Sequence, residues 1–338
     1  MRSPKSKGLR VAVLCGGVSS EREISLRSGA QVIKHLPASY KSQLIEISAN
    51  GRWLLPTKIA ATNDKALVKK NDVAIAQGFD IVFIALHGKY GEDGRVQALL
   101  ELSGIPYTGS GVLASALAMD KFKTQELLRA TGIQSPKTIY ASRSTPLASI
   151  LRNVRAEISF PCVVKPNESG SSLGVTIVEK PAQLKSAIQH AFEEDTHVLI
   201  QERIVGRELT CGVMGNTERT EMVPLPPIEI IPDGTFFDYT AKYTSKKTKE
   251  ICPARIGARQ THEVQKLAIR VHTLLGCDGL TRSDFILTES GELYFLEVNT
   301  IPGLTEQSLC PKEAQAMGLS FTQFLEKLID LAQTKWRS

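Results

Sequence analysis

A carboxylate and an amide stand two residues apart in a segment with strand character near the C-terminal end. Glu297 and Asn299 flank Val298, and the two-residue period of a strand directs both side chains to one face. Asp284, on the preceding predicted strand, can pair across to that face. Two carboxylates and an amide supply the oxygen ligands that Mg²⁺ prefers beside nucleotide phosphates. The pattern predicts a magnesium site; the alternative is an exposed strand face whose charges are paired.

Three cationic residues favour the phosphate interpretation. Arg282 precedes Asp284 by two residues and shares its face, where a guanidinium can neutralise developing negative charge. Lys165 ends a β-branched run, and Lys121 opens a helix. A lysine beside phosphates acts as a fixed point charge, although each lysine taken singly is also typical of an ordinary surface.

Glycine-rich segments give weaker indications. The loop 170–174, GSSLG, offers backbone N–H groups and hydroxyls, as phosphate-covering loops do. The Walker A pattern is absent, so ATP requires a different fold. Residues 109–114 match the dinucleotide fingerprint, but the short segment IPYT before them cannot supply the required strand. We interpret that match as coincidental.

The first 120 residues alternate between strand and helix patterns. Strands are predicted at 9–15, 44–48 and 80–86, with helices at 92–103 and 111–119. Ser20 and Glu23 form an S-x-x-E capping box that predicts a helix start, which places Glu21 in the first helical turn. This alternation predicts a parallel sheet with helical crossovers.

From about Pro136 on, the sequence changes to a pattern of alternating strands. Asp120 is suited to cap a helix over 121–130, and the runs 160–165 and 174–179 predict a hairpin around the glycine-rich loop. The segment 224–258 is long and irregular, which is typical of a functional loop. Further strands are predicted at 198–202, 208–214, 282–287 and 293–299, and further helices at 262–275 and 321–336.

Composition excludes several classes of protein. The 338 residues, 42% hydrophobic and 22% charged, are typical of a globular chain of about two or three units. The net charge of +6 is spread along the chain, which disfavours nucleic acid as a partner. No apolar run approaches the roughly 18 residues of a membrane span, and none resembles a signal-peptide core. A cytoplasmic protein is expected, with six reduced, buried cysteines that form no C-x-x-C pair.

Six segments, in order along the chain, together resemble the D-alanine–D-alanine ligase family. They are GGVSSEREISLRSG near the start, ALHGKYGEDG at 85–94, YTGSGVLASALAMDK at 107–121, VVKPNESGSSLG at 163–174, FFDYTAKY at 236–243 and EVNTIPGLTEQSL at 297–309. The resemblance implies an α/β multidomain chain with an ATP-grasp fold. Its expected parts are a Rossmann-like substrate domain (1–120), a central ATP-grasp lobe (121–207) and a C-terminal lobe with the catalytic and metal site (208–338).

The resemblance also implies amino-acid contacts. Glu21 would hold the ammonium of the first D-alanine and connect to Ser171 and Tyr243, with His87 beside the same substrate. Ser308 would bind the carboxylate of the second D-alanine, together with Gly303 and Leu309. Arg282 and backbone N–H groups near Gly303 would stabilise the tetrahedral oxyanion.

Nucleotide and metal contacts follow from the same resemblance. Lys121, Lys165 and Lys242 would contact the phosphates of ATP, and Glu208 the ribose. Ser171, Ser172, Glu202, Ile204 and Phe236 complete the expected nucleotide site, while Asp284, Glu297 and Asn299 would bind a pair of Mg²⁺ or Mn²⁺ ions. The chain departs from many relatives at Gln201, just before the adenine-contacting segment.

The implied reaction is ATP-dependent ligation of two D-alanines through a D-alanyl phosphate, for peptidoglycan precursors, cell-wall biogenesis and cell shape. The family also implies a homodimer. A tyrosine at position 243 is typical of dipeptide-forming members rather than relatives that use D-lactate. The alternatives are a ligase with another acceptor such as D-lactate, a non-catalytic nucleotide-binding paralogue, and a nicotinamide enzyme suggested only by residues 109–114.

Overall fold

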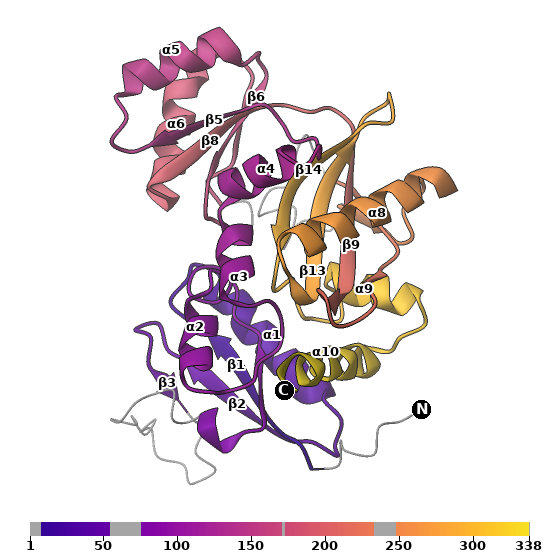
Figure 1. Cartoon of the computed structure of the whole chain (residues 1–338). Coiled ribbons are helices and arrows are strands. Elements are labelled where there is room, and N and C mark those ends of the chain that lie inside the picture. The colour runs from indigo at the N-terminus through magenta and orange to yellow at the C-terminus, as the bar shows by residue number, and fades with distance from the viewer. Residues whose placement is uncertain (1–7, 55–75, 171–172, 233–247, 338) are drawn as a thin grey trace.

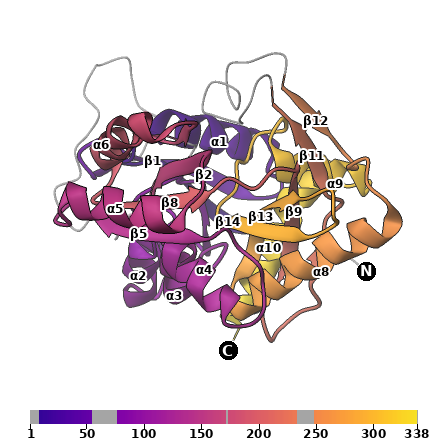
Figure 2. The same ribbon diagram turned by 90° about the horizontal axis from the view of Figure 1, so that it is seen from above.

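In the part of the chain that the structure describes, three separate β-sheets are joined by helices. The computed structural model describes residues 8–54, 76–170, 173–232 and 248–337. In Figure 1 the N-terminal sheet lies at the bottom, with the middle sheet and the C-terminal sheet above it. Figure 2 shows the middle sheet (β5, β8) and the C-terminal sheet (β9, β13, β14) next to each other. Cavities can form in the regions where two of these sheets meet.

The N-terminal sheet has the order β3-β2-β1-β4. Strands β1 (Arg10–Gly16), β2 (Lys41–Ile47) and β4 (Ile81–Ile84) are parallel, and β3 (Trp53–Leu54) is antiparallel. Helix α1 (Arg22–His35) lies between β1 and β2 in the chain, and α2 (Arg95–Leu102) and α3 (Val112–Met119) follow β4. All four residues of β4 are buried, as is typical of a parallel strand covered on both faces. The predicted parallel sheet is confirmed.

Two predicted helix caps have different outcomes. The capping box of Ser20 and Glu23 is wrong, because α1 begins at Arg22 and Glu21 occupies the N-cap position without a side-chain cap. The Ser19 hydroxyl instead accepts the Glu21 N–H at 3.1 Å. The Asp120 cap is confirmed: its Oδ1 accepts the Lys123 N–H at 3.0 Å, at the start of α4 (Lys121–Arg129).

The middle sheet is antiparallel, in the order β5-β8-β6-β7. Its strands are β5 (Thr138–Ser142), β6 (Cys162–Pro166), β7 (Thr176–Val178) and β8 (His197–Glu202). β6 pairs with β7, so the predicted hairpin is confirmed. Helices α5 (Leu147–Glu157) and α6 (Leu184–Glu194), with the short 3₁₀ turn Pro181–Gln183, were not predicted; their apolar residues share one core with the sheet.

The C-terminal sheet is also antiparallel, in the order β12-β11-β9-β13-β14, with β10 beside β9. Its long members are β9 (Arg207–Asn216), β13 (Asp278–Leu287) and β14 (Leu293–Asn299), and α8 (Ala258–Leu274) packs on it. The predicted irregular stretch 224–258 is partly wrong. It contains β11 (Ile228–Ile231) and β12 (Lys249–Ile251), next to the short β10 (Val223–Pro224).

The last helix returns to the first sheet. After α9 (Leu309–Ala316), helix α10 (Phe321–Trp336) buries Phe324 and Leu328 in the same core as Val13 of β1. Figure 1 shows α10 between the N-terminal sheet and the C-terminal sheet. Strand β1 and helix α10, which are far apart in the sequence, therefore share one hydrophobic core.

All six cysteines are free thiols; five are buried and Cys252 is half-buried. In the described part of the chain, no helix combines the length and the apolar composition that crossing a bilayer requires.

Candidate active site

Two cavities meet at β14. The larger, of about 490 Å³, lies between residues of the middle sheet and of the C-terminal sheet. The smaller, of about 350 Å³, is enclosed by α1, the loop after β4 and the loop after β14. Glu297 lines both cavities. A group transferred between molecules bound in the two cavities would pass beside this carboxylate.

The larger cavity combines an apolar wall with charged residues. Its apolar lining includes Val163, Ile177, Ile286 and Leu296, which suits a flat organic ring system. Its charged lining includes Lys121, Lys165, Glu202, Glu208, Asp284 and Glu297, with Ile204 beside them. Asp284 and Glu297 are predicted metal ligands, and the other five are the predicted nucleotide-contacting residues that the structure describes.

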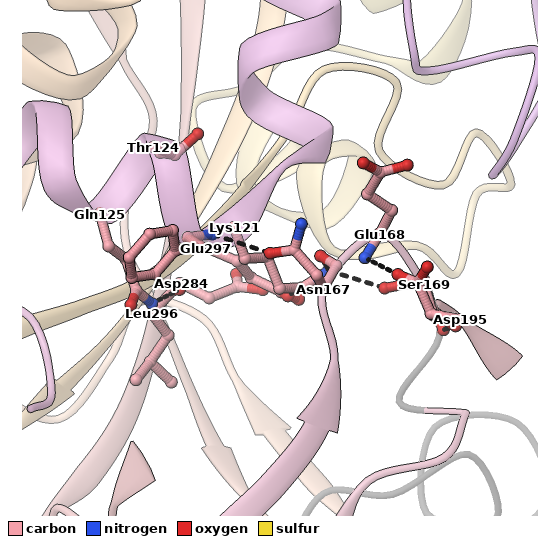
Figure 3. A network of polar contacts seen from close by, with 12 residues as sticks. Lys121, Thr124, Gln125, Asn167, Glu168, Ser169, Asp195, Asp284, Leu296 and Glu297 are labelled. Atoms are coloured by element: carbon pink, nitrogen blue, oxygen red, sulfur yellow. Dashed lines mark hydrogen bonds and ion pairs between the residues drawn. The ribbon is translucent and has the colours of Figure 1, made fainter. Parts of the chain in front are cut away.

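Lys121 is the buried cation of this cavity. Its side chain extends from the start of α4 toward the loop after β6 and toward Glu297 (Figure 3). Nζ donates to the carbonyl oxygen of Ser169 at 2.7 Å and lies 3.5 Å from Glu297 Oε2. The ammonium therefore connects the loop that follows β6 with the predicted metal site.

Gln201, where the sequence departs from many relatives, is buried in the wall of the larger cavity. Its Nε2 donates to Gln125 Oε1 at 2.8 Å and to Thr138 Oγ1 at 2.7 Å. Gln125 Nε2 in turn donates to the Leu296 carbonyl at 2.8 Å. The amide thus belongs to a network that ties the middle sheet to α4 and β14.

The four predicted polar residues of β13 and β14 form two cross-strand pairs. Asp284 lies opposite Glu297, and Arg282 lies opposite Asn299. The Arg282 guanidinium donates from Nε and Nη2 to the two oxygens of Asp284, at 2.9 Å each. Burial alone would lower the pKa of Arg282, but the charge and hydrogen bonds of Asp284 outweigh it and raise that pKa. Arg282 is therefore cationic.

The oxygen-rich end of this strand pair fits a hard divalent cation. Asp284 and Glu297 contribute carboxylates on one face, and Asn299 contributes an amide whose buried Nδ2 has no hydrogen-bond partner in the described residues. Within those same residues there is no cluster of three His, Cys, Asp or Glu side chains. A cation here would depend on the amide oxygen and on phosphate oxygens as well.

Glu21 forms one wall of the smaller cavity and is buried between two glycines. A Cβ on Gly88 would lie 2.5 Å from Glu21 Oε2, and one on Gly170 would overlap the same carboxylate. Only glycine at these two positions allows the loop after β4 and the loop after β6 to approach the Glu21 carboxylate so closely. The carboxylate is thus enclosed by segments from two different sheets.

His87 is held as a neutral imidazole in the smaller cavity. Its Nδ1 is 3.0 Å from the Ile301 carbonyl, an acceptor, so Nδ1 carries the proton. Nε2 then accepts from the Ser28 hydroxyl at 2.7 Å. Burial lowers the pKa of His87 to about 4, which keeps the ring neutral at physiological pH.

Glu92 is a buried acid of this cavity that the sequence reasoning missed. Burial, followed by the nearby charge of Glu21, raises the pKa of Glu92 well above its usual range. Its presence in the motif HGKYGEDG was the available indication. The cavity wall also includes Arg27 and Glu250, which lie on elements far apart in the sequence.

The far wall of the smaller cavity is the start of α9. Ser308 is the N-cap residue, and its hydroxyl lies 3.1 Å from the Thr305 N–H. A Cβ on Gly303 would lie 2.8 Å from Ser308 Oγ, so the loop folds tightly over the hydroxyl. The N–H groups of the first helical turn, beginning at Leu309, make this position suited to a carboxylate.

The predicted site residues that the structure describes are distributed over the two cavities. Glu21, His87, Arg282, Asn299, Gly303, Ser308 and Leu309 line the smaller one, and the nucleotide set lines the larger one. Ser171, Ser172, Phe236, Lys242 and Tyr243 lie outside the described residues.

Comparison with known proteins shows the family. A model of the D-ala D-ala ligase N-terminus matches residues 10–110, and a model of the D-ala D-ala ligase C-terminus matches residues 127–330. The chain belongs to the D-alanine–D-alanine ligase family. One relative, the D-alanine–D-alanine ligase of Trichlorobacter lovleyi, is 41% identical over 99% of this chain and 98% of its own length.

Solved structures of this family have the same fold. The VanG D-Ala:D-Ser ligase from Enterococcus faecalis is similar with a TM-score of 0.82 at 36% identity, covering 96% of this chain and 99% of that chain. The D-alanine–D-alanine ligase from Bacillus anthracis, complexed with ATP, is similar with a TM-score of 0.77 at 32% identity, covering 97% and 99%. The predicted fold class, an α/β chain with an ATP-grasp fold, is confirmed.

Proposed function

We propose that this protein joins two molecules of D-alanine into D-alanyl-D-alanine, with conversion of ATP to ADP and phosphate. The observation behind this proposal is the pair of cavities that share Glu297. A carboxylate is a poor electrophile, so a ligase first transfers the γ-phosphoryl group of ATP to it. That transfer requires a nucleotide site and an amino-acid site that meet, as these cavities do.

The larger cavity is the proposed ATP site. Lys121 and Lys165 would neutralise phosphate oxygens, and Glu208 would bind the ribose. Glu202 and Ile204 would line the adenine end, where Glu202 already accepts the Lys137 N–H at 2.7 Å. Ser171, Ser172, Phe236 and Lys242 would complete this site.

Asp284, Glu297 and Asn299 would hold a pair of Mg²⁺ or Mn²⁺ ions. Their carboxylate and amide oxygens fit hard cations better than soft ones. Cations bound there would offset the negative charge that accumulates as the phosphoryl group is transferred. The buried Nδ2 of Asn299, without a partner in the described residues, supports a rearrangement of this amide when the site is filled.

The smaller cavity is the proposed amino-acid site. Glu21 would bind the ammonium of the first D-alanine, with His87 beside it. Ser308, with the Leu309 N–H, would bind the carboxylate of the second D-alanine. The deprotonated amine of the second D-alanine attacks the acyl phosphate carbon; Arg282 and the Gly303 N–H would stabilise the oxyanion until the C–O bond breaks and phosphate leaves.

D-alanine is the proposed second substrate, and D-lactate and D-serine are the alternative acceptors. Tyr243 favours D-alanine over D-lactate, and the Trichlorobacter relative is a D-alanine–D-alanine ligase. The similarity to a D-Ala:D-Ser ligase makes D-serine the acceptor to compare directly. A non-catalytic paralogue is disfavoured because Arg282, Asp284, Glu297 and Asn299 are all present.

We also propose the organisation and cellular setting of the chain. Residues 1–120 would form the substrate domain, 121–207 the central lobe and 208–338 the C-terminal lobe. The product is a peptidoglycan precursor made in the cytoplasm for cell-wall biogenesis. A homodimer through the N-terminal domain is consistent with three exposed leucines on α2 and α3, Leu99, Leu102 and Leu113; sedimentation velocity would measure it.

Product identification tests the proposal. The protein is incubated with ATP, Mg²⁺ and D-alanine, and the products are analysed by mass spectrometry. We expect D-alanyl-D-alanine with one ADP per dipeptide. ADP release is then compared with D-alanine alone and with D-serine or D-lactate added as acceptor. Absence of dipeptide with D-alanine, together with a mixed product from another acceptor, would reject D-alanine as the second substrate.

A further inference from the structure

Both polar groups of the Ile301 backbone are held by side chains of the loop that follows β4. The Ile301 N–H donates to Glu92 Oε1 at 3.2 Å, and the Ile301 carbonyl accepts from His87 Nδ1 at 3.0 Å. Glu92 and Ile301 are 209 positions apart in the sequence. Two side chains from one short loop therefore fix one residue of another segment from both sides.

Ile301 begins the segment that encloses the far end of the smaller cavity. Gly303 and Ser308 follow within a few residues, and Ser308 starts α9. The side chain of Ile301 is itself buried, and Ile301, Gly303 and Ser308 all line the cavity. The position of Ile301 thus determines where the loop 301–308 begins.

The same loop after β4 also touches Glu21. Glu92 Oε2 accepts the Gly88 N–H at 2.7 Å, and a Cβ on Gly88 would lie 2.5 Å from Glu21 Oε2. Gly88 is therefore in contact with Glu21 on one side and with Glu92 on the other. A continuous series of contacts runs from Glu21 through Gly88 and Glu92 to Ile301.

We propose that Glu92 is a positioning residue that sets the location of the acceptor loop, residues 301–308, relative to Glu21. The inference rests on the proposed function, because it assigns the two ends of this series to the two amino-acid substrates. Bond formation between two bound molecules is sensitive to their separation. Glu92 acts through the Gly88 and Ile301 backbones and needs no contact with either substrate.

A carboxyl group is suited to this role because each of its oxygens accepts one backbone N–H. A glutamine of the same length has a single acceptor oxygen, so Glu92→Gln would place an NH₂ donor against one of the two N–H groups. Asp93 provides a matched control in the same loop. It also accepts two backbone N–H groups, from Tyr90 in that loop at 2.7 Å and from Arg95 at the start of α2 at 3.2 Å, but neither belongs to the segment 301–308.

The test compares Glu92→Gln and Asp93→Asn with the unmodified protein by two measurements. The first is hydrogen–deuterium exchange of the peptide 300–308 in the absence of substrates. The second is steady-state kinetics, with separate KM values for donor and acceptor D-alanine and for ATP. For Glu92→Gln we expect about tenfold faster exchange of this peptide and an acceptor KM raised by about tenfold, because one buried hydrogen bond is lost.

Asp93→Asn is expected to change neither quantity. The proposal would be overturned if Glu92→Gln folded and showed the same exchange of the peptide 300–308 and the same acceptor KM as the unmodified protein. Equal effects of the two variants would also overturn it. If Glu92→Gln does not fold, Glu92→Asp replaces it, with the same directions expected because the shorter stem withdraws both oxygens. The exchange measurement needs no substrate, so a failure of the proposed function leaves it interpretable.

Discussion

Arg282 donates hydrogen bonds to both carboxylate oxygens of Asp284, with Nε and Nη2 each at 2.9 Å. Thr210, on the neighbouring strand β9, donates to Asp284 Oδ1 at 2.6 Å. The guanidinium proposed to stabilise the oxyanion is therefore oriented by a carboxylate proposed to bind metal. The amino-acid site and the nucleotide site share this ion pair.

Replacing Arg282 tests whether its forked geometry or only its charge is required. Arg282→Lys keeps a charge but cannot reproduce two parallel N–H donors. We expect kcat to fall by about 10²- to 10³-fold in Arg282→Lys, and further in Arg282→Met, because an oxyanion donor is removed. Steady-state ADP release measures kcat, and circular dichroism checks the fold. Unchanged kcat in both variants would contradict the proposed role.

Glu297 connects the two cavities, and its neutral variant tests its proposed role in binding metal. Glu297→Gln preserves size but removes the charge that lies 3.5 Å from Lys121 Nζ. We expect turnover to fall to background while the protein remains folded. ADP release at increasing Mg²⁺ measures the loss. Glu292→Gln, exposed on the turn of the same hairpin, should retain activity; equal activity of the two variants would reject the metal assignment.

Gly170 limits how closely the loop after β6 approaches Glu21. A Cβ at this position would overlap the Glu21 carboxylate, so Gly170→Ala should displace either the loop or Glu21. We expect the KM for the first D-alanine to rise by about tenfold, as a weakened charged contact implies. Gly78→Ala is the control, because a Cβ there meets nothing within 4 Å. A normal KM in Gly170→Ala would show that the loop yields without effect.

The strand pair of the site was predictable because its determinants are local. Side chains alternate along a strand, so Glu297 and Asn299 share a face, and the short connection from β13 to β14 brings Asp284 opposite Glu297. The short strand β12 was missed because neighbouring Pro, Asp and Lys residues obscure its alternation. Sheet pairing with β11 stabilises it in the structure.

Contacts between distant segments were not predictable from periodicity. The bond from Ile301 to Glu92 depends on how the N-terminal sheet meets the C-terminal sheet, and α10 contributes to that packing by burying Phe324 beside residues of β1. No pattern in a single sequence indicates which apolar face meets which. The ordered motifs implied the family and its substrates, whereas the tertiary contacts revealed Glu92.

Glu313 is a buried carboxyl group beneath the site whose ionisation should affect stability. Its two oxygens accept the Gly212 N–H at 3.2 and 3.1 Å, and Gly212 lies opposite Arg282 in the β9–β13 pairing. Burial raises the pKa of Glu313 from 4.5 to about 8, despite hydrogen bonds from Gly212 and Cys310 that lower it. Between these pH values the folded protein keeps a proton that the unfolded chain has released.

The sign of the pH effect follows from this difference. Because the folded state binds more protons, the free energy of unfolding falls as pH rises from about 4.5 to about 8. In Glu313→Gln this pH-dependent loss of unfolding free energy is absent, because glutamine does not ionise. The amide oxygen still accepts the Gly212 N–H. Relative to the unmodified protein, Glu313→Gln should therefore gain about 1 to 2 kcal/mol of stability between pH 6.5 and 8.

Urea unfolding at several pH values between 6.5 and 8 measures this gain. This range excludes pH values below about 6.5, where two buried histidines also affect stability. The pKa values of His87 and His272 are lowered to about 4, so the free energy of unfolding falls as the pH falls below about 6.5. The raised pKa of Glu92 contributes equally to both proteins and cancels in the comparison. Glu263→Gln, at an exposed position on α8, controls for loss of a carboxyl group. Parallel stability curves for Glu313→Gln and the unmodified protein would mean that Glu313 is ionised in the fold.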